Sequence, residues 1–364
     1  MSNLVKVKDV IERVNTKEDR FNTDRLYYVG GEHFQSRALT VDDRGIIKGS
    51  TIGPMFYYGF KSNDFLLVSR NPHLRKAGLV NFDGICSEKT FVLHTKDERI
   101  LLQKFMPFIF QNERFWKYAI ANKHGSTNFF VNWSTLADYS FELPSIEQQK
   151  AISKLLWALN DTKKAYEDLI QKTDELVKSQ FIEMFGDPVS NSQRRRRVPF
   201  AKFIANIRYG TSQPPEFSES GEYKFIRATN IKAGRIVPDD IVRINKSEAS
   251  KIEKCRLSGG EIIIVRSGVN TGDTCVVTDE YKGQYAGYDI IVTLDLNKSN
   301  PVFFNELLNT HYMNDVVKPL TARSAQPHLN SQQVQNLPMI VASIDEQNRF
   351  AEIVEQSDKS KFEL

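Results

Sequence analysis

Residues 145–185 read SIEQQKAISKLLWALNDTKKAYEDLIQKTDELVKSQFIEMF, and this stretch decides the organisation of the chain. Pro144 cannot continue a helix from upstream, and Ser145 followed by Glu147 is typical of a helix N-terminus. Gly186, with a proline two residues later, provides the stop signal. We predict one helix of about 41 residues, or ~60 Å at ~1.5 Å per residue. That is longer than a compact domain needs.

Apolar side chains recur along this helix at alternating steps of three and four residues. Such spacing predicts a seam that packs against a partner helix. Because the polar face is extensive, a coiled-coil spacer is favoured over a helix buried in a bundle core. The predicted packing residues are Ile152, Leu155, Leu159, Tyr166, Leu169 and Leu176.

The chain also contains an internal repeat with a nearly constant offset. Two β-type runs of the first half recur in the second half at one offset, and the opening of the long helix recurs at almost the same offset. Four anchors agree to within one residue, which chance similarity between strands does not explain. The pairs are residues 64–68 with 261–265, 26–29 with 223–226, 145–149 with 343–347, and Asn132 with Asn330.

Each repeat reads as a globular unit followed by a helix. Within each unit, β-type runs alternate with glycine-rich turns, and helical stretches follow at 101–122 and 301–318. The predicted fold class is therefore α+β, with four segments: 1–142, 143–188, 189–342 and 343–364. The second helix, predicted at 343–364, is much shorter than the first at 145–185, so we expect it to cover only about half of the first helix's seam.

Charge is distributed along the repeat rather than evenly. The 364 residues carry 49 Lys and Arg against 45 Asp and Glu, a net charge of +4. The two globular segments carry 20 basic against 16 acidic and 20 against 15 side chains, whereas both helical segments are net acidic. Two basic units separated by a long helix are well suited to binding a polyanion at two places.

Several classes of protein are excluded. No apolar run approaches the ~18 residues of a membrane helix, and the charged N-terminus argues against a secretory signal. Three widely spaced cysteines fit a reducing cytoplasm. We find no phosphate-binding loop, no methyltransferase motif and no ligand spacing among the six histidines, so we expect neither a catalytic residue nor a metal site.

The sequence resembles the specificity subunits of type I restriction–modification systems. The resemblance covers nearly the whole chain from about residue 26, and the order and twofold repetition of its motifs make it specific. These motifs are LPSIEQQ at 143–149, FIEMFGDP at 181–188, FIRATNI at 225–231, GEIIIVRSG at 260–268, AQPHLN at 325–330 and SIDEQNRFA at 343–351.

This resemblance implies two target-recognition domains of mixed α/β structure, held apart by two long helices packed antiparallel. Each domain would read one half of a split, asymmetric site in double-stranded DNA. Methyltransferase and restriction (translocase) subunits would assemble on the helices. S-adenosylmethionine and ATP are then expected on those partner subunits, with no cofactor bound by this chain.

Reading base edges requires Arg, Asn, Gln, Ser and Thr on exposed loops. Equivalent loops of the two repeats differ in side chain, as readers of different half-sites should. Gly268 and Gly272 are expected to let the backbone approach DNA closely. The candidate DNA contacts are Ser69, Arg70, His73, Arg75, His124, Ser126, Thr127, Asn128, Arg227, Thr229, Asn230, Arg266, Ser267, Asn270, Arg323, Ser324, Gln326 and His328. A polar turn that touches nothing is the alternative for each loop.

Four consecutive arginines follow the helix stop: Arg194, Arg195, Arg196 and Arg197. They form either a solvated linker or a phosphate clamp at the root of the second domain.

Two other functions remain open at the level of sequence. The short second helix is also compatible with a truncated or silent scaffold-like allele, or with self-association or a second chain that completes the arm. A self-contained nuclease would have to use Asp273, Glu280 and Lys282, a spacing that arises often by chance.

Overall fold

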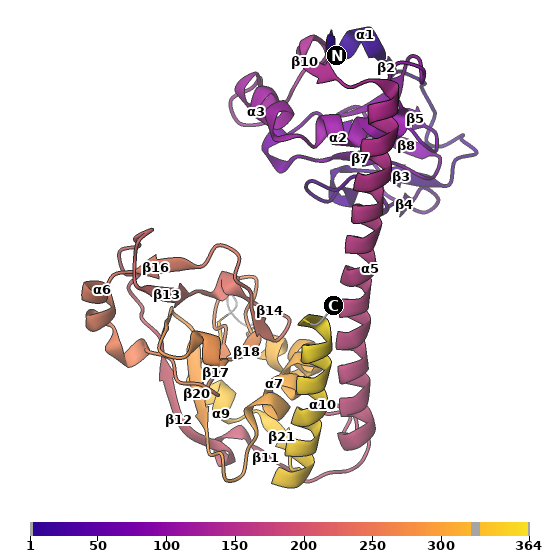
Figure 1. The fold of residues 1–364 in the computed structure, drawn as a ribbon. Coiled ribbons are helices and arrows are strands. Elements are labelled where there is room, and N and C mark those ends of the chain that lie inside the picture. Colours follow the sequence, from indigo (N-terminus) through magenta and orange to yellow (C-terminus); the bar gives the residue numbers. More distant parts are fainter. Residues whose placement is uncertain (1–2, 322–327, 363–364) are drawn as a thin grey trace. The chain divides into compact units, whose positions relative to one another are not determined.

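The computed structural model describes residues 3–321 and 328–362, and the chain divides into two compact units, 1–165 and 166–364 (Figure 1). Three of the predicted DNA contacts, Arg323, Ser324 and Gln326, lie outside the described residues.

The first unit contains two four-stranded sheets and one two-stranded ribbon. The larger core lies between one sheet, in the order β2-β9-β6-β7, and the helices that cover it. In the other sheet, β4-β3-β8-β5, the pair β3 and β8 is parallel. The strands are β1 Asn3–Lys6, β2 Ile11–Val14, β3 Tyr27–Val29, β4 Gly45–Ile46, β5 Phe56–Phe60, β6 Phe65–Val68, β7 Ala77–Leu79, β8 Gly84–Ser87, β9 Thr90–Thr95 and β10 Ser140–Leu143.

Short helices complete this unit. The stretch predicted as helical at 101–122 is divided into two helices and a 3-10 turn, since Asn112 caps the second of them through a side-chain hydrogen bond to the Arg114 amide. The helices are α1 Val7–Val10, α2 Met106–Phe110, α3 Glu113–Ala121 and α4 Trp133–Asp138, followed by the first half of α5 Ile146–Phe185.

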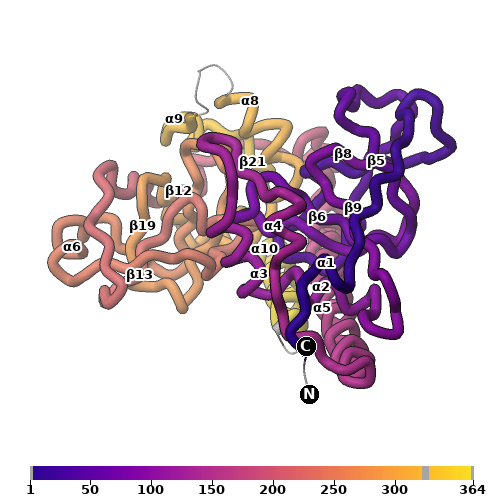
Figure 2. The backbone as a smooth tube through the Cα atoms, turned by 90° about the horizontal axis from the view of Figure 1, so that it is seen from above, coloured from indigo at the N-terminus to yellow at the C-terminus, as the bar shows by residue number. Residues whose placement is uncertain are grey.

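The second unit repeats this architecture. A four-stranded sheet, β12-β20-β17-β18, packs on helices, and α6 lies beside a smaller sheet of β16, β13 and β19 (Figure 2). Its strands are β11 Arg197–Pro199, β12 Ile204–Tyr209, β13 Tyr223–Ile226, β14 Ile231–Lys232, β15 Arg235–Ile236, β16 Val242–Ile244, β17 Ile262–Ile264, β18 Thr274–Val276, β19 Tyr285–Ala286, β20 Ile290–Leu294 and β21 Pro338–Ile340. Its helices are α6 Lys246–Lys251, α7 Pro301–Asn309, α8 Lys318–Thr321, α9 Ser331–Gln335 and α10 Ile344–Phe362, with a π-helical turn at 313–317.

The strand pairing confirms the predicted repeat. The order β2-β9-β6-β7 corresponds strand by strand to β12-β20-β17-β18, and the parallel pair β3–β8 corresponds to the parallel pair β13–β19. The ribbons β1–β10 and β11–β21 are also equivalent. The mixed helix-and-strand class predicted from the sequence is therefore correct, and both units are built on one plan.

A buried glutamine joins each long helix to its globular part in the same way. The amide of Gln149 donates to the carbonyls of Ile100 and Pro144 and accepts from the Leu102 N–H, at 2.9–3.0 Å. Gln347, its counterpart in the second repeat, makes the same three contacts with the corresponding backbone groups, at 2.8–3.1 Å. Both side chains are fully buried. The glutamine in each repeated SIEQQ or SIDEQ motif is thus a structural element of the fold.

Helix α5 packs within the first unit through residues four apart. Gln149 and Ser153 are buried, and the Trp157 indole N–H donates to the Lys104 carbonyl at 2.9 Å. The same indole meets the Phe108 ring edge-on at 5.6 Å. This face, and not the predicted seam, contacts the globular part.

In the second unit, α5 and α10 run antiparallel, as predicted. Asp174 on α5 lies beside Lys361 near the end of α10, whereas Phe185 lies beside Phe350 near its start. Four fully buried phenylalanines, including Phe181 and Phe303 of α7, form the centre of this contact, with ring centroids 4.9–6.4 Å apart.

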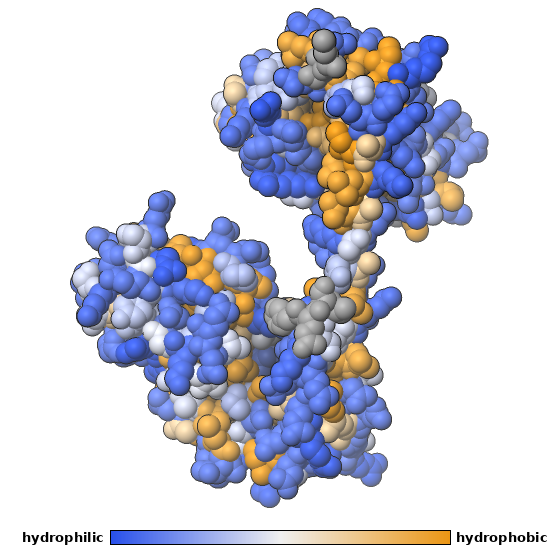
Figure 3. Space-filling view, viewed as in Figure 1, coloured by the Kyte–Doolittle hydropathy of each residue, from blue (hydrophilic) through white to orange (hydrophobic). Residues whose placement is uncertain are grey.

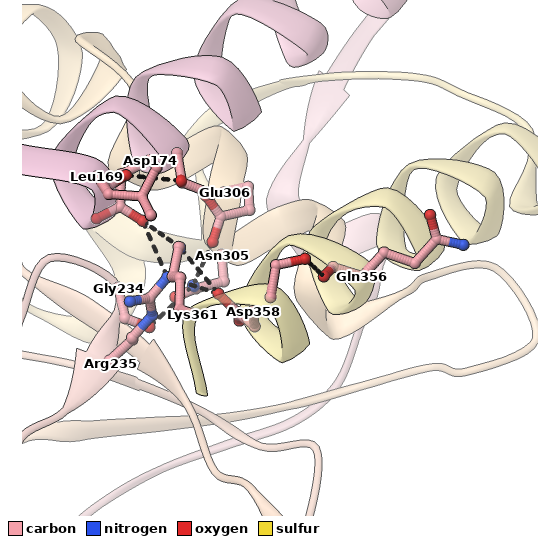
Figure 4. Close-up of polar contacts among 11 residues, drawn as sticks. Leu169, Asp174, Gly234, Arg235, Asn305, Glu306, Gln356, Asp358 and Lys361 are labelled. Carbon is pink, nitrogen blue, oxygen red and sulfur yellow. Dashed lines mark hydrogen bonds and ion pairs between the residues drawn. The ribbon is translucent and has the colours of Figure 1, made fainter. Parts of the chain in front are cut away.

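A charge cluster closes the other end of the helix pair (Figure 4). Arg235 of β15 contacts Asp174 at 3.0 Å and Asp358 of α10 at 2.7 Å. Lys361, almost fully buried, contacts the same two carboxylates at 2.5 and 3.0 Å. Burial raises the pKa of the neighbouring Glu306. Asp174 and Asp358 are therefore each shared by Arg235 and Lys361. These contacts fix the last turn of α10 to α5 and to the β14–β15 hairpin.

The predicted seam of α5 is corrected by these contacts. The helix pair uses Val177, Phe181 and Phe185, one position away from the predicted Leu176, because the large aromatic side chains decide which face is buried. Apolar side chains remain at the surface along α5 (Figure 3). The six predicted packing residues are between 37% and 61% exposed: Ile152, Leu155, Leu159, Tyr166, Leu169 and Leu176.

Candidate nucleic-acid interface

In the first unit, the structure brings the two predicted loops together. The loop after β6 pairs with the loop before α4 through a bridge between Arg70 and Phe130. The Asn71 N–H donates to the Phe129 carbonyl at 2.8 Å, and the Val131 N–H donates to the Ser69 carbonyl at 2.9 Å. Two loops that are far apart in the sequence thus form one polar surface.

Six of the eight candidate side chains on these loops are exposed, and two are not. The exposed ones are Arg70, His73, His124, Ser126, Thr127 and Asn128. Ser69 is buried, and its hydroxyl donates to the Lys89 carbonyl at 2.8 Å. Arg75 forms a bidentate pair with Glu113, whose pKa is lowered by that hydrogen bond. Ser69 and Arg75 support the loop, so we retain neither as a DNA contact.

The second unit joins the equivalent loops at the equivalent place. Ser267 bridges His328, and the Leu329 N–H donates to the Arg266 carbonyl at 2.8 Å. Residues 328–329, just before α9, therefore lie against the loop after β17, as their counterparts do in the first unit. The backbone arrangement is shared by the two units while the side chains differ.

The loop from Arg266 to Gly272 has a fixed shape. Gly268 and Gly272 adopt φ of 92° and 97°, values that disfavour any residue with a Cβ. The Thr271 hydroxyl donates to the Gly268 carbonyl at 2.6 Å. Gly272 is buried, with a hypothetical Cβ only 2.4 Å from the Met313 sulfur, so it serves packing rather than approach to DNA. Val269, at the tip, is 99% exposed.

Arg266 is enclosed by His328 and by two tyrosines that the sequence did not single out. Its guanidinium carbon lies 4.5 Å from the Tyr209 ring centroid and 4.3 Å from that of Tyr288. One terminal nitrogen is 2.6 Å from His328 Nε2, and its backbone N–H donates to the buried carboxylate of Asp289 at 3.2 Å. The aromatic residues stand where β12 ends and β20 begins, a position that carries no short-range sequence signal.

The comparisons with known proteins agree with this arrangement. The family described as type I restriction modification DNA specificity domain matches the chain twice, at residues 2–173 and 202–364. The chain belongs to this family.

One solved structure in particular shares the fold. The S subunit of the type I restriction–modification system of M. genitalium has a TM-score of 0.60 at 15% identity, over 100% of this chain and 91% of that chain. The HsdS subunit of Thermoanaerobacter tengcongensis has a TM-score of 0.39 at 16% identity, over 99% and 90%. A chain from a study of complex assembly and conformational transition of the type I R-M system has a TM-score of 0.47 at 16% identity, over 99% of this chain and 92% of that chain.

In this specificity subunit, the segment 227–230 mixes one exposed side chain with supporting ones. Asn230 is fully buried, accepting from the Arg227 N–H at 3.0 Å and donating to the Asp239 carbonyl at 2.8 Å. Arg227 donates to the Asp240 carbonyl at 2.5 Å, whereas Thr229 is exposed. Asn230 therefore shapes the turn, and we no longer count it among DNA contacts.

Beside Arg266 the surface forms a recess of about 450 Å³. Its walls include Phe217, Tyr288 and Asp289, and it is bordered by Ser267. The amide of Asn270 donates to the Ala228 carbonyl at 3.4 Å, which links the β17–β18 loop to the turn after β13. The loops of this specificity domain are thus connected to one another.

The four arginines after α5 do not act alike. Arg195 donates to Glu346 at 3.0 Å and to the Met184 carbonyl at 2.9 Å, so it ties the start of α10 to the end of α5. Arg197 donates to the carbonyls of residues 188 and 189 at 2.6 Å. Arg194, Arg196 and Arg197 are all exposed, but among the described residues Arg194 and Arg196 make no side-chain hydrogen bond. The clamp interpretation therefore applies to Arg194 and Arg196 alone.

Neither a membrane-spanning helix nor a metal site is found in residues 3–321 and 328–362. No helix there is long and apolar enough to cross a bilayer. No group of three or more His, Cys, Asp or Glu side chains is placed to hold a metal ion. Of the carboxylates considered for a nuclease, Glu280 is paired with Lys224 at 2.7 Å.

Proposed function

We propose that this specificity subunit selects the DNA site of a type I restriction–modification complex, with each unit reading one half of a bipartite, asymmetric sequence. The observation that carries the proposal is the duplicated loop surface. In both units the loop after β6 or β17 is bridged to the loop before α4 or α9, while the side chains presented there differ. One scaffold with two different reading surfaces suits two different half-sites.

The reading surfaces carry the right chemistry. Arg70, His124 and Asn128 in the first unit, and Arg266 and Ser267 in the second, offer donors and acceptors that match base edges in the major groove. The exposed Arg194 and Arg196 would add sequence-independent phosphate contacts. Affinity would then fall with rising salt, and specificity would depend on the loops.

Methyltransferase subunits would dock on the exposed apolar face of α5, and the restriction (translocase) subunits would join through them. Leu155, Leu159 and Leu176 are more than half exposed there, and their burial by a partner would be favourable. The chain itself would be non-catalytic and would act in the cytoplasm. S-adenosylmethionine and ATP would be bound by the partners and not by this chain.

The test is to co-express the chain with methyltransferase subunits and to map methylated adenines by long-read sequencing. A split, asymmetric motif is the expected result. A palindromic motif would instead indicate that two copies use one unit twice. The absence of any motif, with a complex that still assembles, would contradict sequence selection and favour a scaffold role.

A further inference from the structure

We propose that Arg266 is the residue of the second unit that reads a guanine, and that Tyr209, Tyr288 and His328 position its guanidinium for that contact. The inference rests on the proposed function, namely that this unit reads DNA. It goes further in assigning one residue to one base and three positioning residues to that residue.

The geometry holds the guanidinium from several sides. Both tyrosine rings lie well within the ~6 Å over which a cation interacts with an aromatic face. Tyr209 is itself fixed, because its hydroxyl contacts the Ser331 N–H at 2.8 Å and the Ser331 hydroxyl at 3.0 Å. A side chain as long as arginine loses much rotamer entropy when it binds. Enclosure by the two rings restricts the Arg266 side chain already in the free protein, so less rotamer entropy is lost when DNA binds.

The contact with His328 fixes which hydrogens remain available. Arginine has only donors, so His328 Nε2 at 2.6 Å must accept, and the imidazole is neutral with its proton on Nδ1. Burial and the Arg266 charge lower the pKa of His328, which favours that form. The Arg266 Nε is buried and has no hydrogen-bond partner in the part of the chain that the structure describes. No hydrogen bond among the described residues uses Nη1.

Nη2, which contacts His328, has a second hydrogen, so Nη1 and Nη2 together still offer two donors to a ligand. Two parallel donors at this spacing match O6 and N7 of guanine in the major groove, the commonest specific contact of arginine. A phosphate could also accept from this edge, but it would not require a fixed orientation. The enclosure favours a base, because base reading gains most from a pre-oriented side chain.

The first unit lacks this arrangement. The position equivalent to Arg266 is Ser69, which is buried and bonded to the Lys89 carbonyl. Arg13 does meet two rings there, 5.4 Å from Tyr58 and 4.8 Å from Phe91, but it projects from β2 and not from the loop. The guanine reader is thus a property of the second half-site.

The experiment uses the chain with its methyltransferase subunits and the duplex identified by methylation mapping. Each guanine of the second half-site is replaced in turn by 7-deazaguanine, which pairs normally but lacks the N7 acceptor. Dissociation constants are measured by fluorescence anisotropy. At one guanine we expect the replacement to weaken wild-type binding about fivefold or more. Arg266→Ala should be insensitive to that replacement.

Variants of Tyr288 test the positioning role. Tyr288 is partly exposed, and no hydrogen bond of its hydroxyl is seen among the described residues, so Tyr288→Phe keeps the ring and should keep the discrimination. Tyr288→Ala should reduce the discrimination while leaving binding to unrelated DNA unchanged. Far-UV circular dichroism confirms that each variant is folded.

Three outcomes would overturn the inference. Sequence-specific binding without loss at any 7-deazaguanine would show that no N7 is read. An equal loss by Arg266→Ala on all sequences would make Arg266 a phosphate contact. Equal effects of Tyr288→Phe and Tyr288→Ala would remove the positioning role. Absence of any sequence-specific binding by the wild type would instead refute the proposed function itself.

Discussion

Replacing Asp289 by asparagine should change the stability of the second unit more favourably at neutral pH than at acidic pH. Asp289 is 3% exposed, and burial raises its pKa to about 6 from an ordinary value of 3.8. The Arg266 N–H and the Arg266 charge oppose that shift without cancelling it.

The sign follows from the raised pKa. Well below pH 3.8 the carboxyl is protonated in both folded and unfolded states and costs no stability. As the pH rises through 6, the folded state must ionise a buried group, so stability is lost. A pKa raised from 3.8 to about 6, at ~1.4 kcal/mol per pH unit, corresponds to about 3 kcal/mol of stability lost between about pH 3 and pH 8.

Asparagine keeps the acceptor for the Arg266 N–H but never ionises. Its buried NH₂ group adds a cost of its own, which is the same at every pH and cancels when the two pH values are compared. The quantity to measure is therefore the stability difference between variant and wild type at pH 8 minus the same difference at pH 4.5. We expect about 2 kcal/mol.

The chain offers an internal reference for this assay. Trp116, Trp133 and Trp157 all lie in the first unit, so urea unfolding followed by tryptophan fluorescence reports that unit, whereas far-UV circular dichroism reports both. The fluorescence transition should be unchanged by Asp289→Asn. Asp279→Asn, at an exposed position of the same unit, controls for removal of a charge. A stability difference that is constant with pH, or that grows on acidification, would refute the reasoning.

Three further predictions concern the helix pair and its anchors. Phe350→Ala should lower the free energy of unfolding by about 3–5 kcal/mol and accelerate amide hydrogen exchange in α10. Unchanged exchange would contradict the packing of Phe350. Gln347→Ala should lower the free energy of unfolding by about 3 kcal/mol when unfolding is followed by circular dichroism. The matched Gln149→Ala should instead lower the stability reported by tryptophan fluorescence. A change below about 1 kcal/mol in both variants would count against the shared anchor. The hydrogen bond from Arg195 lowers the pKa of Glu346 to about 2, so Glu346→Gln should lower the free energy of unfolding by about 1–2 kcal/mol at pH 7 in urea titrations, and by less as the pH falls below 4.5 and on through 2; a loss of undiminished size at pH 2 would contradict it.

The elements that the sequence predicted best are those set by local signals or by repetition. The long helix was expected at 145–185 and is found at 146–185, because a proline, a serine cap and a glycine mark its ends. The repeat offset predicted that both units share one plan, and the strand orders agree.

Side-chain roles were predicted less well, because they depend on contacts between distant segments. Ser69 and Arg75 have the residue types of DNA readers, yet one is buried and the other is paired with Glu113. The enclosure of Arg266 depends on Tyr209 and Tyr288, which lie at the ends of other strands, and no local pattern indicates it. The sequence predicted the packing face of α5 one residue away from the observed face, because the spacing of apolar residues does not distinguish phenylalanine from leucine.

The central claim is that each unit reads its own half of one DNA site, and a domain exchange tests it most directly. Residues 191–342 are replaced by the corresponding segment of a related specificity subunit, and methylated adenines are mapped with the same methyltransferase subunits. We predict that one half of the bipartite motif changes while the other half and the spacing stay the same. A change in both halves, or in neither, would contradict the account.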